Sequence, residues 1–220
     1  MVISIVISLL LVAIAYLLGS IPTGYILGKS LAGIDIREHG SGSTGATNVL
    51  RTIGKKSAIA VLLIDMLKGA IAVLLVKLIY LYAPLYITPA LLPANWELWE
   101  LWLIVATALA AIFGHSKSVW LNFTGGKSVA TSLGVVFVMN PILALGTLAA
   151  FGVTIAISRI VSLSSIVGAI TLNLLAIFVD GSVPYIIFAA LAGGYVIFRH
   201  RSNIQRLLAG EEPKIGQTVN

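Results

Sequence analysis

The sequence contains no cysteine among its 220 residues, which excludes disulfides, thiolate metal sites, iron–sulfur clusters and a cysteine nucleophile. Charge is also scarce, because 10% of the residues are charged where about 25% is usual in a soluble domain. Hydrophobic residues make up 59% of the chain, which excludes a disordered polypeptide. A mean hydropathy of +1.04 allows several segments of about 20 apolar residues. These values predict an all-α integral membrane protein.

Apolar runs bounded by charges or turn residues predict seven transmembrane helices, at residues 3–27, 58–81, 99–114, 129–139, 141–158, 161–179 and 184–199. The first run lacks the basic region of a signal peptide and therefore predicts a retained span. The fourth span is short and ends at Asn140–Pro141, so a half-span or one kinked helix with the fifth is the alternative. The chain is expected to form a single membrane domain over 1–220, with residues 199–220 as its tail.

The basic residues are distributed unevenly over the predicted connections. The first connection has five, the third two, the fifth one and the tail four, whereas the second, fourth and sixth have none. Because Lys and Arg favour the cytoplasmic side, this alternation predicts an outside N-terminus and a cytoplasmic C-terminus. It favours seven spans over six, since merging the fourth and fifth helices would place basic connections on the wrong side.

The first basic connection contains a run of Gly and small hydroxyl residues from Gly40 to Asn48, followed by Arg51. Glycines let successive backbone N–H groups point at one anion, and the hydroxyls of Ser41 and Ser43 add donors. The composition fits two interpretations equally well: a phosphate-binding site, and a flexible loop near anionic lipid headgroups.

The third connection ends in Gly125-Gly126-Lys127-Ser128 immediately before a predicted helix. Backbone donors, the helix dipole and an ammonium would meet an anion there, although Lys127 could instead be an interfacial lysine. The Gly-Lys-Ser triplets at 28–30 and 126–128 are not P-loops, because the first glycine of G-x4-G-K is replaced by Thr23 and Leu121.

The tail begins with Arg199-His200, and Asn203 follows. If the last helix continues, His200 and Asn203 lie at i and i+3 on one face, ready to bind a common group. The alternative is a stop sequence with an incidental histidine. Asp65 and Lys68 are also at i and i+3, within the second span, and are expected to form a structural ion pair.

These segments, with Arg159 and the serines at 162–165, all fall on the predicted cytoplasmic face. The excess of basic, hydroxyl and amide groups indicates a substrate that carries phosphate. From the residues alone, an enzyme, a transporter of a phosphorylated solute and a lipid-binding subunit remain as interpretations.

Six segments together resemble the bacterial acyl-phosphate:glycerol-3-phosphate acyltransferases of the PlsY type. They are Gly19-Ser20-Ile21-Pro22, Gly40 to Arg51, Asp65-x-x-Lys68-Gly69, Gly114 to Thr131, Val161-Ser162-Leu163-x-Ser165, and Arg199 to Leu207. The segments span nearly the whole chain in the family's order.

The resemblance implies a multi-pass enzyme of the bacterial inner membrane with its active site on the cytoplasmic face. Such an enzyme transfers a fatty acyl group from acyl phosphate to the 1-hydroxyl of glycerol 3-phosphate, which gives lysophosphatidic acid and phosphate for phospholipid synthesis. We expect a monomer among membrane lipids, with no cofactor, metal or nucleic-acid partner. The H-x4-D box of other glycerolipid acyltransferases is absent, because Thr44, Trp120 and Gln205 follow the histidines at that spacing.

By motif position, the resemblance assigns catalysis to Ser41, Arg51, Lys127, His200 and Asn203. It assigns substrate or phosphate binding to Ser43, Asn48, Gly125, Gly126 and Ser165. The chain departs from the common pattern at four positions: Ser43 replaces Asn, Ser118 replaces Pro, Thr124 replaces Lys and Ser128 replaces Gly. The expected mechanism is direct attack by the glycerol hydroxyl, with His200 either orienting the substrate or acting as general base.

Overall fold

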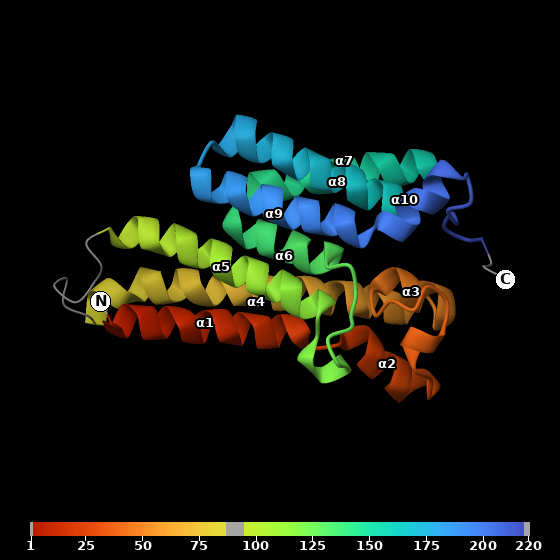
Figure 1. Ribbon diagram of the computed structural model, residues 1–220, viewed down its shortest axis with the longest axis horizontal. Coiled ribbons are helices and arrows are strands. Elements are labelled where there is room, and N and C mark those ends of the chain that lie inside the picture. Colours follow the sequence, from red (N-terminus) through yellow and green to blue (C-terminus); the bar gives the residue numbers. More distant parts are fainter. Residues whose placement is uncertain (1, 87–94, 218–220) are drawn as a thin grey trace.

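The computed structural model describes residues 2–86 and 95–217, and within them every regular element is helical (Figure 1). The α-helices are α1 (Val2–Ser20), α2 (Thr23–Ala32), α3 (Ala46–Thr52), α4 (Lys55–Tyr86), α5 (Trp96–Ser116), α6 (Val129–Met139), α7 (Pro141–Ser158), α8 (Val161–Leu175), α9 (Val183–Arg199) and α10 (Arg201–Leu208). Short 3-10 turns lie at Ile36–Glu38 and Val119–Leu121, and a π-helical turn at Ala176–Asp180 continues α8.

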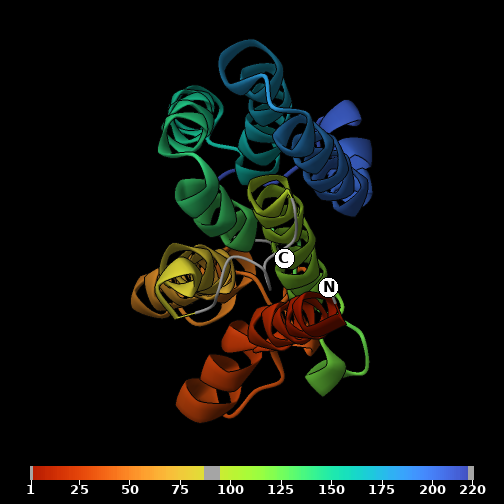
Figure 2. The same cartoon turned by 90° about the vertical axis from the view of Figure 1, so that its left-hand side faces the viewer.

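The long helices run side by side along the longest axis of the molecule (Figure 1). Figure 2, which looks along that axis, shows α1 and α4 on one side, α7, α8 and α9 on the other, and α5 and α6 between them. The largest buried cluster joins these groups and includes Val76, Ile104, Val135, Ala144 and Phe188. The core therefore lies in the middle of the bundle, and α6 connects its two halves.

The predicted helices at 129–139 and 141–158 are confirmed by α6 and α7. The predicted span over 3–27 corresponds to the apolar segment Ser4–Ala32, but it is divided into α1 and α2 at Pro22, which cannot donate a backbone hydrogen bond. Side chains compensate for the interruption: Lys68 Nζ donates to the carbonyl of Ile21 at 2.8 Å, and Ser118 Oγ donates to that of Ser20 at 2.5 Å.

The last helix does not continue straight through His200 and Asn203, so the condition for placing both on one helix face is not met. Helix α9 ends at Arg199, and α10 departs from its direction by 59°. His200 lies at the bend, where its backbone N–H still bonds to the carbonyls of Val196 and Ile197.

Five helical segments are long and apolar enough to cross a membrane, namely Ser4–Ala32, Lys55–Ala83, Trp96–Ser116, Pro141–Ser158 and Val161–Asp180. The bent pair of α9 and α10 raises the number to six. Helix α6 has 11 residues and spans about 16 Å. The described part of the chain therefore has the segments of a multi-pass membrane protein.

Glycine allows the backbones at two helix contacts to approach closely. A Cβ at Gly19 of α1 would lie 2.1 Å from the carbonyl oxygen of Ala111 in α5. A Cβ at Gly134 of α6 would lie 1.9 Å from that of Met66 in α4. The first contact holds α1 against α5, and the second holds α6 against α4 at Met66, which lines the cavity described below.

Polar side chains hold the two ends of α6 and α7 at Asn140. Lys77 Nζ donates to the carbonyls of Val138 and Met139, at 2.6 and 3.3 Å. Asn140 Oδ1 accepts from the backbone N–H of Ile142 at 3.0 Å and so caps α7. The short helix thus ends inside the bundle without unpaired terminal carbonyls at these two residues.

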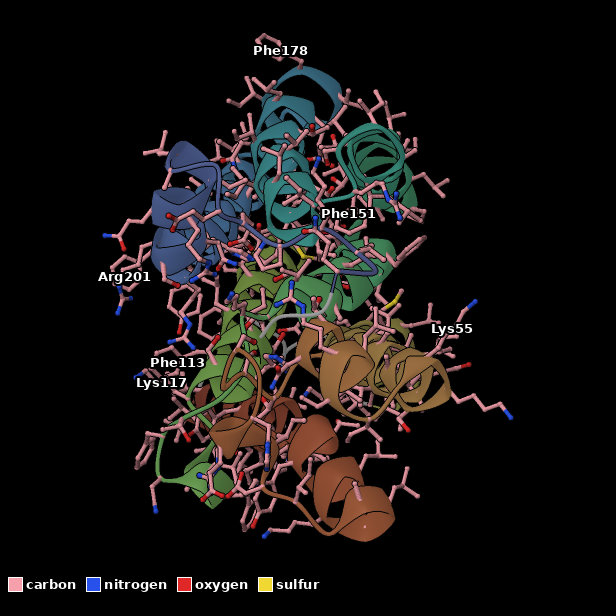
Figure 3. All side chains as sticks on the ribbon, turned by 90° about the vertical axis from the view of Figure 1, so that its right-hand side faces the viewer. Lys55, Phe113, Lys117, Phe151, Phe178 and Arg201 are labelled. Carbon is pink, nitrogen blue, oxygen red and sulfur yellow. The ribbon has the colours of Figure 1, made fainter. Side chains whose placement is uncertain are left out.

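In Figure 1 the basic connection 29–56, the loop at 159–160 and α10 lie toward the right-hand end of the molecule, and the connection 117–128 lies in the same half, nearer the middle. Figure 3 looks onto this end and shows Lys55, Lys117 and Arg201 toward its edge and Phe151 nearer the middle. The segments grouped together by the charge count are therefore neighbours in space.

Candidate functional site

A cavity of about 780 Å³ opens at this end of the bundle. Its wall is formed by the 41–51 segment, by residues of α4 to α10, by the loop before α6 and by the tail. Eight of the predicted site residues line it: Ser41, Ser43, Asn48, Arg51, Lys127, Ser165, His200 and Asn203. Gly125 and Gly126 are not among the lining residues.

Asn48 organises the loop that carries Ser41 and Ser43. It is buried, and its Nδ2 lies 2.9–3.0 Å from the carbonyl oxygens of Ile36, His39 and Ser43. Its Oδ1 accepts the backbone N–H of Ser41 at 2.8 Å. The Asn48 amide therefore acts on the loop backbone, and the loop in turn presents the serines at the cavity.

Lys127 extends into the cavity from the loop before α6. Its Nζ donates to Asn203 Oδ1 at 2.5 Å, which joins two segments that are distant in the sequence. Burial lowers the pKa of Lys127 to about 8; Glu212 opposes the shift, and Arg206, Arg199 and Arg51 favour it. A substrate phosphate placed here would favour the charged ammonium.

Gly125 and Gly126 support Lys127 through their backbone. The Gly126 N–H donates to the carbonyl of His115 at 3.2 Å. Arg199 Nη2 donates to the carbonyls of Gly125 and Gly126, at 3.3 and 3.0 Å. The structure packs both glycines closely against His115, and their role in phosphate binding stays a prediction.

His200 is buried with its Nδ1 2.7 Å from the carbonyl of Val196. A carbonyl oxygen only accepts, so Nδ1 carries the proton and a neutral imidazole keeps its lone pair on Nε2. The ring can therefore accept a hydrogen bond or a proton from a hydroxyl in the cavity.

Glu212 is a lining residue that the sequence analysis missed. It is buried, and its carboxylate accepts from Ser162 Oγ at 2.8 Å, Asn203 Nδ2 at 2.6 Å and Arg206 Nε at 2.7 Å. Burial alone would raise the pKa of Glu212, but these three hydrogen bonds outweigh it and hold the pKa below its ordinary value. The sequence feature that could have pointed to Glu212 is the pair of acidic residues, Glu211 and Glu212, in an otherwise basic tail.

Most of the remaining cavity wall is apolar, although Asp65, His115, Ser132 and Thr147 also line it. Side chains from four helices form it: Leu62, Met66, Leu133, Leu148, Phe151 and Leu172. One end thus offers cations, hydroxyls and an amide, and the other offers hydrocarbon. A helical membrane protein with such a cavity belongs to the class that handles an anionic headgroup together with an acyl chain.

Comparison with known proteins identifies the family within this class. Residues 9–210 match the family model described as glycerol-3-phosphate acyltransferase. The glycerol-3-phosphate acyltransferase of Rippkaea orientalis is 62% identical over 213 residues, which cover 97% of this chain and 95% of the relative. The glycerol-3-phosphate acyltransferase of Synechocystis is 57% identical over 212 residues, which cover 96% of this chain and 92% of the relative.

Two solved structures of PlsY, an integral membrane glycerol 3-phosphate acyltransferase, are also similar. The glycerol 3-phosphate form is 38% identical with a TM-score of 0.81, and the match covers 95% of this chain and 96% of that one. The lysophosphatidic acid form has a TM-score of 0.77 and the same identity, and the match covers 95% of each chain. The chain belongs to the PlsY-type glycerol-3-phosphate acyltransferase family.

Proposed function

We propose that the enzyme takes its acyl group from acyl phosphate and transfers it to the 1-hydroxyl of glycerol 3-phosphate. The acylation of glycerol 3-phosphate to lysophosphatidic acid is the activity of its family and decides against the transporter alternative. The observation that carries the proposal is the two-part cavity of about 780 Å³, with the basic residues at one end and an apolar wall at the other.

In the proposed reaction, the hydroxyl oxygen of glycerol 3-phosphate attacks the carbonyl carbon of the acyl phosphate. The bond between that carbon and the bridging oxygen breaks, and phosphate leaves with the electron pair. The hydroxyl proton passes to the leaving phosphate or to His200 Nε2. Arg51 and Lys127 neutralise phosphate charge, which stabilises the transition state without a protein nucleophile.

The cavity receives hydroxyl groups from Ser41, Ser43 and Ser165. The side-chain amide of Asn203 links two charged groups: its Oδ1 accepts from the Lys127 ammonium, and its Nδ2 donates to the Glu212 carboxylate. We assign phosphate binding to Arg51, Lys127 and the serines, and positioning of Lys127 to Gly125 and Gly126. The mechanism uses no cofactor or metal ion, and a single chain contains all of these groups.

The role of His200 is tested with His200→Ala and His200→Gln. A glutamine side chain can place a hydrogen-bonding group near the position of Nε2, although it cannot act as the base. If His200 orients the hydroxyl, His200→Gln keeps far more activity than His200→Ala, and both have the pH profile of the parent. Loss of a titrating limb in both variants, with equal rate losses, would instead assign general-base catalysis to His200.

We infer seven spans with the basic end on the cytoplasmic side of the bacterial inner membrane. The five long segments, α6 and the bent α9–α10 pair supply these spans, and the alternation of basic connections supports their orientation. The absence of cysteine makes a direct test possible: Lys214→Cys in the tail and Glu97→Cys in α5 each introduce one exposed thiol. In intact cells with a permeable outer barrier, an impermeant maleimide should label Glu97→Cys and leave Lys214→Cys unlabelled.

The donor is tested with purified protein, labelled glycerol 3-phosphate and either palmitoyl phosphate or palmitoyl-CoA. Formation of lysophosphatidic acid with palmitoyl phosphate is expected, and Lys127→Met should abolish it. Lys117→Met is the matched control, since this lysine belongs to the same connection but does not line the cavity. Product formed only from palmitoyl-CoA would show that the proposed donor is wrong.

A further inference from the structure

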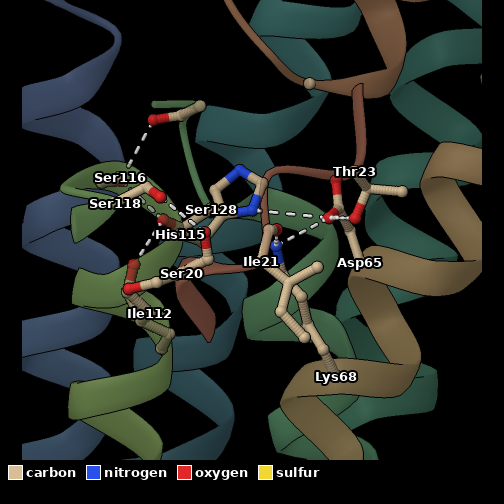
Figure 4. Close-up of polar contacts among 12 residues, drawn as sticks. Ser20, Ile21, Thr23, Asp65, Lys68, Ile112, His115, Ser116, Ser118 and Ser128 are labelled. Carbon is tan, nitrogen blue, oxygen red and sulfur yellow. Dashed lines mark hydrogen bonds and ion pairs between the residues drawn. The ribbon is translucent and has the colours of Figure 1, made fainter. Parts of the chain in front are cut away.

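A group of buried polar side chains joins α2, α4 and α5 (Figure 4). It takes no part in the proposed reaction, although Asp65 and His115 both line the cavity. Its centre is Asp65 of α4, which is buried. The Asp65 carboxylate lies 2.8 Å from Lys68 Nζ and accepts from Thr23 Oγ1 at 3.0 Å. The expected ion pair of Asp65 and Lys68 is thus confirmed, and it also holds the start of α2.

His115 of α5 links this group to the loop. Its Nδ1 lies 3.6 Å from Asp65 Oδ1 and has no closer hydrogen-bond partner within the described residues. On the opposite side of the ring, a Cβ at Gly126 would lie only 2.1 Å from Nε2. The imidazole therefore fills the space between the carboxylate and the glycine backbone.

The turn formed by Gly125 and Gly126 is held from several directions. A Cβ at Gly125 would lie 2.3 Å from the carbonyl oxygen of His115, which also accepts the Gly126 N–H. Arg199 Nη2 donates to the Gly126 carbonyl at 3.0 Å, and Ser116 Oγ lies at the same distance from that carbonyl oxygen. Because Lys127 is the next residue, the position of this turn determines where the Lys127 side chain enters the cavity and where its ammonium lies.

We propose that Asp65 and His115 are positioning residues for Lys127. The carboxylate lies beside the imidazole at 3.6 Å, and the imidazole packs against the glycine turn. Lys68 balances the charge of Asp65, so the group needs no charge on His115. The inference rests on the proposed function, in which Lys127 binds substrate phosphate. A displacement of about 1 Å at such a group can cost on the order of 100-fold in rate.

A double-mutant cycle between His115→Ala and Gly126→Ala tests this proposal. Each single variant should lower kcat/KM for glycerol 3-phosphate by roughly 10-fold to 100-fold. Removal of the imidazole leaves room for the new Cβ, so the double variant should be no worse than the poorer single variant. Thr107→Ala is the control, because this buried hydroxyl of α5 bonds only to Leu103 and Ile104 and should leave the rate unchanged.

Two further variants separate positioning from folding. His115→Asn retains an N–H donor near the position of Nδ1 and should recover much of the rate lost in His115→Ala, whereas His115→Leu should not. Asp65→Asn keeps the side-chain volume and should lower the rate of protein that remains folded, as judged by its thermal midpoint in detergent.

The outcomes also distinguish this inference from the proposed site. Full activity of Lys127→Met would overturn the proposed site. A second combination of results would overturn only the assignment of Asp65 and His115. In it Lys127→Met is inactive, the losses in kcat/KM of His115→Ala and Gly126→Ala multiply in the double variant, and His115→Asn recovers no activity. Rate losses that follow the loss of folded protein in every variant would overturn it as well.

Discussion

Ser128 adopts a left-handed backbone conformation, with φ at 63°, that glycine reaches more easily. Its hydroxyl is buried, donates to the carbonyl of Ile112 at 2.7 Å and lies 2.6 Å from Ser116 Oγ. The departure from glycine at this position therefore exchanges backbone strain of about 1 kcal/mol for two buried hydrogen bonds of about 1 kcal/mol each.

The balance predicts the order of stability among variants at position 128. Ser128→Gly should be slightly less stable than the parent, because it loses the hydrogen bonds while it relieves the strain. Ser128→Ala should be the least stable, since it loses the same bonds and keeps the strain, by about 1 kcal/mol relative to Ser128→Gly. Thermal midpoints in one detergent measure this order, and an alanine variant at least as stable as the glycine variant would contradict it.

Lys127 predicts a pH dependence of the reaction. Its pKa of about 8 means that the free enzyme carries the ammonium below pH 8 and loses it above. We therefore expect kcat/KM for glycerol 3-phosphate to fall above about pH 8, by tenfold per pH unit in the limit. Lys127→Arg stays charged and should lack this alkaline limb, even if its overall rate is lower. Rates are corrected for spontaneous hydrolysis of the acyl phosphate, and an unchanged limb in Lys127→Arg would exclude Lys127 as its source.

Residue patterns predicted the members of the site better than their contacts. The resemblance gave Ser41, Arg51 and Lys127, and the structure places all three on one cavity. It gave no indication of Glu212, whose partners lie up to 50 residues away. The acidic pair in the basic tail marks its position in the sequence, but no local pattern shows that this carboxylate bonds to Ser162 of α8.

At the scale of elements, hydropathy located the helices, and local backbone chemistry decided where they break. The run over 3–27 is uniformly apolar, so its interruption at Pro22 depends on a missing N–H group that hydropathy does not measure. The bend at His200 has no proline, and tertiary contacts at that point determine it. The end of the short helix α6 could be predicted from the sequence, because Asn140 caps the following helix and Pro141 favours the first position of that helix.

The contact between α4 and α6 predicts the effect of a single methyl group. Gly134→Ala would place a Cβ 1.9 Å from the Met66 carbonyl, so the helices must separate. We expect a loss of roughly 1–3 kcal/mol in stability, and a lower rate because the loop that carries Lys127 enters α6. Gly194→Ala is the matched control, since its Cβ would meet no atom within 4 Å. Equal midpoints and rates for the two variants would show that the contact is not tight.

At the scale of the whole molecule, the net charge of +6 has two consequences in a chain that is 59% hydrophobic. The basic connections gather at one end of the bundle, where their positive charge favours one orientation in the membrane. The same end contains the polar part of the cavity, with Arg51 and Lys127 in its wall. A water-soluble phosphate compound and a membrane-dissolved acyl donor can meet there.

The apolar part of the cavity predicts that acyl-chain length can be changed without affecting glycerol 3-phosphate. Gly168 of α8 lines it, and a Cβ there would lie 3.6 Å from Thr147 Cγ2, at ordinary contact distance. Gly168→Leu should therefore fold, and its side chain should occupy part of the space proposed for the acyl chain. Each methylene kept out of an apolar site forfeits about 0.8 kcal/mol, so preference should shift toward shorter donors.

The measurement compares kcat/KM for acyl phosphates of decreasing chain length, together with KM for glycerol 3-phosphate. Gly152→Leu of α7 is the control, because its Cβ would have no neighbour within 4 Å and Gly152 does not line the cavity. We expect the long donors to lose most in Gly168→Leu, and KM for glycerol 3-phosphate to stay unchanged in both variants. Equal losses for all chain lengths would place the acyl chain elsewhere, since only a group in the path of the chain can discriminate by its length.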